Sequence, residues 1–242
     1  MVGRDHPGAP GAGAGDEMTE PSERTAIVDL QVWSDIACPW CFIGKRRLER
    51  ALADEPEGSI RVRWRAFELN GTIPEGGLDA RQFYIQKFGG EQRMRDIFAH
   101  VTAVAAGEGI GMDFGRMRRA PNTRLAHRLI ALAAENGRQA AAVEALFRGH
   151  FEKGANVGDL DEALALLDSH GTELEVAALR EAVARGEGRE SVEGDIAAAV
   201  RLGIASVPFF VAASRYAVSG AQAPAAFTQL IAAASGRIPV KG

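Results

Sequence analysis

The stretch Cys38-Pro39-Trp40-Cys41 contains both cysteines of this 242-residue chain. Residues 26–33, which precede it, are β-branched and apolar without a helical period, and this pattern predicts a strand. Residues 42–53, which follow it, place their apolar side chains on one helical face, and this spacing predicts a helix. We therefore expect the cysteine pair at the point where a strand turns into the N-terminus of a helix.

This position favours a thiolate at Cys38. The first turn of a helix offers unpaired N–H groups and the positive end of the helix dipole, and Pro39 suits its first position. We expect an exposed, partly ionised Cys38 that attacks a disulfide, and a shielded Cys41 that resolves the resulting mixed disulfide. Trp40 is expected to shape substrate access between the cysteines or to shield Cys41.

Two other interpretations of the cysteine pair are open. A zinc site would need two further ligands, and the five histidines are scattered without the spacing of a second ligand pair. The pair could also mark a plain helix start that carries no chemistry. The strand–turn–helix context favours redox chemistry over both, and we expect no bound metal and no bound cofactor.

Composition argues against several classes of protein. The net charge is −4, which speaks against a nucleic-acid partner, and no apolar run approaches transmembrane length, so we expect no membrane association. Residues 1–24 are rich in Gly, Ala, Pro and charge, and we expect a disordered tail rather than a signal peptide, with Met18 as an alternative start. We expect a cytoplasmic protein, in which a catalytic dithiol is more common than a structural disulfide; the oligomeric state is left open.

Residues 60–67 form the clearest strand of the sequence. Arg61, Arg63 and Arg65 alternate with apolar residues, and their face is expected to be solvated or to meet carboxylates. From about residue 76 to 188 the pattern becomes helical, with a capping box predicted at Thr172 and Glu175 and further helices predicted over residues 80–88, 91–106, 123–137, 143–154 and 159–171.

The last part of the chain returns to mixed structure. A helix ends near Gly203, and strands are predicted from residue 206 to 211 and from 215 to 218, joined by a tight turn near Ala213 and Ser214. Pro224 suits the first position of a final helix. Without the helical block, the order is strand, helix, strand, followed by helix, strand, strand, helix.

This order, together with the two cysteines and Val207-Pro208, resembles the α/β thioredoxin-like fold with a large helical insertion found in DsbA-type oxidoreductases. The match narrows to the FrnE branch, which is grouped with the 2-hydroxychromene-2-carboxylate isomerases, on residues 35–44, 67–70, 121–123, 126–127, 207–210 and 220–222. The resemblance covers about residues 26–235. It implies a thioredoxin-like domain of residues 25–75 and 189–242, and an inserted helical domain of residues 76–188.

The resemblance also implies roles for single residues. Cys38 would be the nucleophile and Cys41 the resolving thiol. Pro208 would be the cis-proline that faces the cysteines and pairs its backbone with a substrate strand. Substrate binding would fall to Pro39, Trp40, Val207 and Pro208. The isomerases generally carry a serine where Cys38 stands, and this difference favours thiol–disulfide exchange.

Asp35 and His127 are candidates to support the site. Asp35 lies three residues before Cys38 and either acts on the proton of the thiol or simply ends the strand. His127 is a lone histidine on a predicted helix, and such residues are more often core or surface groups than catalytic ones.

The leading functional interpretation is a cytoplasmic dithiol–disulfide oxidoreductase that acts on a disulfide-containing protein or a small-molecule thiol substrate. The alternative is a glutathione-dependent isomerase of a small aromatic or polyketide-like substrate, with glutathione as co-substrate. A third interpretation is a thiol-binding or metal-binding module without catalysis.

Overall fold

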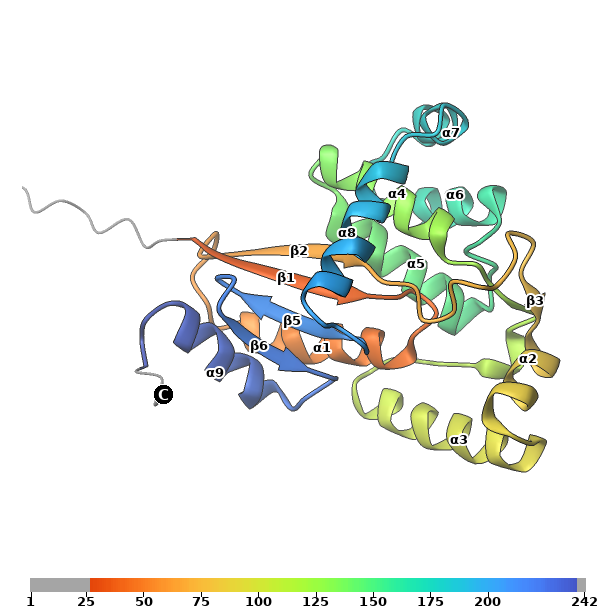
Figure 1. The fold of residues 1–242 in the computed structure, drawn as a ribbon, viewed down its shortest axis with the longest axis horizontal. Coiled ribbons are helices and arrows are strands. Elements are labelled where there is room, and N and C mark those ends of the chain that lie inside the picture. Colours follow the sequence, from red (N-terminus) through yellow and green to blue (C-terminus); the bar gives the residue numbers. More distant parts are fainter. Residues whose placement is uncertain (1–26, 239–242) are drawn as a thin grey trace, which may run out of the picture.

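The computed structural model describes residues 27–238 (Figure 1), so the tail predicted for residues 1–24 lies outside the described residues. A four-stranded sheet with the strand order β2-β1-β5-β6 forms its centre. Strands β1 and β2 run parallel, whereas β5 is antiparallel to both β1 and β6. The four strands are β1 Val28–Ser34, β2 Ile60–Ala66, β5 Phe209–Ala212 and β6 Tyr216–Ser219.

Helices cover both faces of this sheet (Figure 1). Helices α1 (Pro39–Leu52) and α9 (Pro224–Ala234) lie on one face, and α8 (Arg189–Arg201) crosses the other. The chain between β2 and α8 is mainly helical: its second half, from residue 124, lies on the β2 side of the sheet, whereas residues 91–107 lie near α1, away from β2. It contains α2 Ala80–Phe88, α3 Glu91–Gly107, α4 Arg124–Glu135, α5 Gln139–Lys153, α6 Leu160–Ser169, α7 Val176–Ala184, a short 3₁₀ turn Phe114–Arg116, and a small ribbon of β3 Leu78–Asp79 and β4 Arg119–Ala120.

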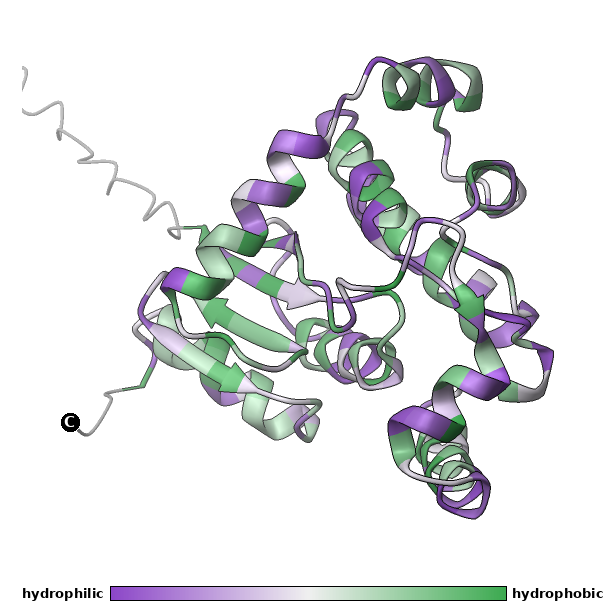
Figure 2. Ribbon diagram, turned by 45° about the vertical axis from the view of Figure 1, so that its right-hand side comes forward, coloured by the Kyte–Doolittle hydropathy of each residue, from purple (hydrophilic) through white to green (hydrophobic). Residues whose placement is uncertain are grey.

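The thioredoxin-like fold with its helical content is confirmed. One hydrophobic core joins the sheet to the helical segment, and Figure 2 shows hydrophobic residues along the central strands. Phe42 of α1 stacks on Phe147 of α5 with ring centroids 5.1 Å apart. A smaller cluster on the opposite face packs Trp33 of β1 against Ala199 and Ile204. The division into a sheet domain and an inserted domain at residues 76 and 188 stays a prediction.

The arginine face of β2 meets carboxylates, one of its two expected environments. The Arg63 Nε donates to Asp29 Oδ1 at 2.7 Å, and Arg65 Nη1 lies 2.9 Å from Asp195 Oδ1 of α8. Arg61 is exposed. Because β2 is an edge strand, its backbone needs partners outside the sheet, and the Gln139 amide provides them at Trp64, where it accepts from the N–H and donates to the carbonyl, each at 3.0 Å.

Two local predictions need correction. The capping box at Thr172 is wrong, because the Thr172 hydroxyl donates to the Leu167 carbonyl at 2.8 Å instead of capping α7. The strand predicted from residue 206 begins at Phe209, after Pro208. The turn at Ala213 and Ser214 is confirmed, since both have positive φ, at 50° and 54°. Among residues 27–238, no helix has the length and apolar character needed to cross a bilayer.

Candidate active site

The two cysteines lie where β1 ends and α1 begins, as the sequence predicts. Cys38 is the N-cap residue of α1, and Pro39 occupies the first helical position. The Cys38 N–H donates to the Asp35 carbonyl, and the Cys41 N–H donates to the Cys38 carbonyl, each at 3.0 Å. Both thiols are free. The turn therefore presents Cys38 to the positive end of the helix dipole.

Cys38 itself is buried, at 4% exposure, so the prediction of an exposed thiol is wrong. Its Sγ donates to the Val207 carbonyl at 3.7 Å, and the Val207–Pro208 peptide bond is cis. On another side, Tyr84 and Lys87 of α2 lie within electrostatic reach of Cys38. Val207, which is distant in the sequence, thus lies against a thiol that the local motif alone would leave open.

Residues 35–41 form the turn with the two cysteines, here called the redox turn. Trp40 belongs to this turn, and its side chain lies near α3. Its side chain is half-buried, and its ring centroid is 6.1 Å from that of His100. The expectation that Trp40 shapes access to the cysteines stays a prediction. The His100 side chain lies beside Trp40 at the same place.

Cys41 is shielded, as the sequence predicts, with no exposed surface. Burial raises the pKa of the Cys41 thiol well above its usual range, and the neighbouring Cys38 raises it further. The backbone of Asp35 and the hydroxyl of Ser34 act in the opposite direction. The Cys41 thiol is therefore held in its protonated form at neutral pH.

Asp35 is buried beneath the turn and accepts two backbone hydrogen bonds. Its Oδ1 accepts from the Ala37 N–H at 3.1 Å, and its Oδ2 accepts from the Leu69 N–H at 2.7 Å. Burial alone would raise the pKa of this carboxyl. His127 and these two N–H groups outweigh burial, so the net pKa is lowered and the carboxylate stays ionised.

His127 of α4 reaches the same place. It is buried at 4% exposure, and its Nε2 is 3.0 Å from the Phe67 carbonyl and 3.6 Å from Asp35 Oδ1. A carbonyl only accepts, so we assign the proton of the imidazole to Nε2. The structure therefore brings both predicted support residues together behind the cysteines.

The sequence analysis missed four side chains around the site, namely Ser34, Tyr84, Lys87 and His100. Lys87 Nζ donates to Asn70 Oδ1 at 3.0 Å. Burial lowers the pKa of Lys87, while the charges of Asp35 and Cys38 raise it. No local pattern marks the residues of α2 and α3, because only the tertiary fold carries these helices to the redox turn.

A second feature near α2 is an apolar groove of about 740 Å³ between α2, α3 and residues 112–118. Three methionines that show no pattern in the sequence all line it, and they are Met94, Met112 and Met117. Tyr84 is a wall of the groove and also lies within electrostatic reach of Cys38. Among residues 27–238, no three His, Cys, Asp or Glu side chains gather as metal ligands would.

Comparisons with known proteins agree with this geometry. Residues 29–232 match the DSBA-like thioredoxin domain family. A crystal structure described as a probable DsbA oxidoreductase from Streptomyces coelicolor shares 34% identity, with a TM-score of 0.79 over 88% of this chain and 93% of that one.

More distant structures share the fold. The cytosolic disulfide reductase DsbM from Pseudomonas aeruginosa, solved with GSH, is 20% identical, with a TM-score of 0.62 over 87% of this chain and 100% of that one. A 2-hydroxychromene-2-carboxylate isomerase is 17% identical, with a TM-score of 0.60 over 86% and 95% of the two chains. The protein YwbO of Bacillus subtilis is 26% identical over 149 residues, 60% of this chain and 66% of its own length, slightly under two thirds.

Proposed function

Because the chain belongs to the DSBA-like thioredoxin domain family, whose members include thiol–disulfide oxidoreductases, we propose that it exchanges disulfides through Cys38 and Cys41. The observation that carries the proposal is the contrast between the two thiols. Cys38 stands at the helix N-terminus against the Val207 carbonyl, whereas Cys41 is fully enclosed with a raised pKa. Cys38 attacks the substrate disulfide, and Cys41 resolves the mixed disulfide.

We further propose that the substrate reaches Cys38 between the Val207–Pro208 loop and α2. Pro39, Trp40, Val207 and Pro208 would contact the substrate, which is a disulfide-containing protein or a small-molecule disulfide. Binding requires the segments that cover Cys38 to move, because Cys38 is 4% exposed. Asp35 and His127 would hold the turn from behind.

The direction we propose is reduction in the cytoplasm, with glutathione or another small thiol as electron donor. A pair of cysteines exposed to a reducing thiol pool rests as the dithiol unless its reduction potential is very low. The cytosolic reductase DsbM, solved with GSH, shares the fold, and this likeness supports the direction without assigning it.

The test is a two-step reaction of the reduced protein with the aromatic disulfide 5,5′-dithiobis(2-nitrobenzoate). Attack by Cys38 releases one coloured thiolate, and resolution by Cys41 releases a second. We expect Cys38→Ala to slow the first release by about 100-fold or more. We expect Cys41→Ser to release one equivalent and to retain the mixed disulfide, which mass spectrometry detects. Unchanged release from Cys38→Ala would overturn the assignment.

The apolar groove favours a second candidate, the glutathione-dependent isomerase. Its volume suits a small organic molecule, and methionine and aromatic side chains adapt to varied apolar ligands. Under the isomerase hypothesis, glutathione occupies the thioredoxin-type site and the aromatic or polyketide-like substrate occupies the groove. Isomerisation of such a substrate with catalytic glutathione and no net disulfide formation would favour this candidate. Net reduction of a disulfide would favour the oxidoreductase.

A further inference from the structure

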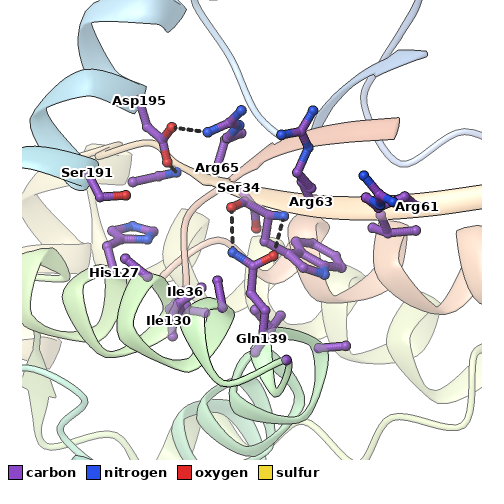
Figure 3. A pocket seen from close by; sticks show the side chains of 18 residues that line it. Ser34, Ile36, Arg61, Arg63, Arg65, His127, Ile130, Gln139, Ser191 and Asp195 are labelled. Carbon is purple, nitrogen blue, oxygen red and sulfur yellow. Dashed lines mark hydrogen bonds and ion pairs between the residues drawn. The ribbon is translucent and has the colours of Figure 1, made fainter. Parts of the chain in front are cut away.

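A cavity of about 520 Å³, here called the back cavity, lies behind the redox turn between β2, α4, α5 and α8. Figure 3 shows Ser34, His127, Gln139 and Asp195 around it. Residues at its mouth are exposed, among them Arg61, Ala134 and Gly137, whereas Ser34, Ile36 and His127 are buried at its floor. The back cavity therefore connects solvent with the rear of β1.

The floor of the back cavity contains an uncommitted hydroxyl. Ser34 is 5% exposed, and its Oγ has no hydrogen-bond partner among the described residues. Ser34 ends β1 directly before the turn that carries both cysteines, and its hydroxyl lowers the pKa of Cys41. A buried hydroxyl without a partner costs about 1–3 kcal/mol. A buried hydroxyl that has this cost is usually explained by a bound water molecule or by a functional role.

Other polar groups near Cys41 are already committed. Both oxygens of Asp35 accept backbone N–H groups, and His127 Nε2 donates to the Phe67 carbonyl. The titratable and charged groups that face Cys41 or the back cavity are Cys38, Asp35, His127, Asp195, Arg61, Arg63 and Arg65, while Tyr84 and Lys87 face Cys38 from α2. Next to the cysteine turn, the Ser34 hydroxyl therefore still has its proton and lone pairs available.

Resolution of a mixed disulfide needs a route for a proton. Cys41 must lose its proton to attack, yet it has no exposed surface. In the mixed disulfide, the substrate occupies the Cys38 side of the turn and blocks exchange with solvent there. The remaining route leads backwards, past Ser34 into the back cavity, which has the room and the polar groups to hold water.

We propose that Ser34 relays the proton of Cys41 to water in the back cavity during resolution, an inference that rests on the proposed function. The Cys41 S–H bond breaks as its proton passes to Ser34 Oγ, and the Ser34 hydroxyl proton passes to water. The Cys41 sulfur then bonds to the Cys38 sulfur, and the bond between Cys38 and the substrate sulfur breaks. Cys41 is oxidised, and the substrate leaves as a thiolate that takes a proton from solvent.

The two coloured releases from 5,5′-dithiobis(2-nitrobenzoate) separate attack from resolution. In Ser34→Ala we expect an unchanged first release and a second release slowed about 100-fold at pH 7, at the lower end of the range of lost proton-transfer catalysis. The deficit closes at alkaline pH, where hydroxide removes the proton directly. Ser34→Thr keeps the hydroxyl and restores the rate. A pH-independent deficit, a slowed first release, or a Ser34→Thr protein as slow as Ser34→Ala would overturn the relay.

Filling the back cavity tests the route without touching the hydroxyl. Ala131 of α4 lines the back cavity, and we expect Ala131→Phe to slow the second release alone. Ala178→Phe is the matched control, because Ala178 lines a separate pocket beside α7. Equal rates for these two variants overturn the route. If the wild-type protein releases one equivalent only, the proposed function fails; if it releases two and Ser34→Ala matches it, the relay alone fails.

Discussion

The two sides of the redox turn differ in how firmly their polar groups are held. On the front, Lys87 and His100 are exposed side chains of α2 and α3 near Cys38 and Trp40. On the back, Asp35 and His127 are buried and bonded to fixed backbone groups. The front can therefore rearrange around a substrate, whereas the back holds the turn in one geometry.

The strongest test of a rigid back is Asp35→Asn. The amide would place an N–H₂ group against one of the two backbone N–H donors that the carboxylate now satisfies, at Ala37 or Leu69. We expect the free energy of unfolding, measured by urea titration at pH 7, to fall by about 3 kcal/mol.

The Asp35 variant also has a pH signature. The folded protein lowers the pKa of Asp35, so the carboxylate stabilises the fold above its ordinary pKa, and this stabilisation disappears as pH falls through the lowered value. Asp35→Asn should flatten this part of the acid profile. Asp29→Asn is the control, because Asp29 forms a half-exposed pair with Arg63 and should cost about 0.5 kcal/mol or less. Equal losses in both variants would contradict a specially rigid back.

A second test addresses the ion pairs between α5 and α1, the helix that begins at the two cysteines. Glu144 of α5 lies 2.6 Å from the Nζ of the buried Lys45 and also pairs with Arg46. Burial alone would raise the pKa of Glu144, but Arg46 and Lys45 outweigh it and lower the pKa to about 2. We expect Glu144→Gln to cost about 2 kcal/mol of unfolding free energy at pH 7.

The sign of the acid dependence follows from the lowered pKa. The Glu144 contribution is complete above the ordinary carboxyl pKa of 4.5 and disappears as pH falls toward about 2. Glu152→Gln is the matched control on the same helix, since its pair with the half-exposed Arg148 is a surface i,i+4 contact. If both variants lose the same free energy of unfolding, the ion pairs between α1 and α5 are no stronger than a surface ion pair.

The front and back also differ in how well the sequence predicts them. The turn, Pro39 at the helix start and the shielded Cys41 follow from local patterns, because neighbouring residues determine them. The burial of Cys38 does not, since Val207, whose carbonyl lies against the Cys38 sulfur, is far away in the sequence.

The sequence predicts the two support residues only in part. Asp35 and His127 are identifiable as candidates from the motif and the family resemblance, but their 3.6 Å approach depends on how α4 packs behind β1. Ser34 carries no sequence signal at all, because its role depends on a missing hydrogen bond and on a cavity formed by four elements. At Thr172 the local pattern predicts a capping box, but the hydroxyl instead donates to the carbonyl of Leu167 in the preceding helix.

The smallest effect we predict is on the front, from Lys87→Met. The ammonium group lies within electrostatic reach of Cys38 and attracts the anionic 5,5′-dithiobis(2-nitrobenzoate), so its removal should slow the first release about 3-fold at low salt. The second release should be unchanged, because Cys41 faces the back. Added salt should shrink the difference, and Lys153→Met, an exposed lysine at the end of α5, should match the wild type. A slowed second release in Lys87→Met would show that the two sides are coupled.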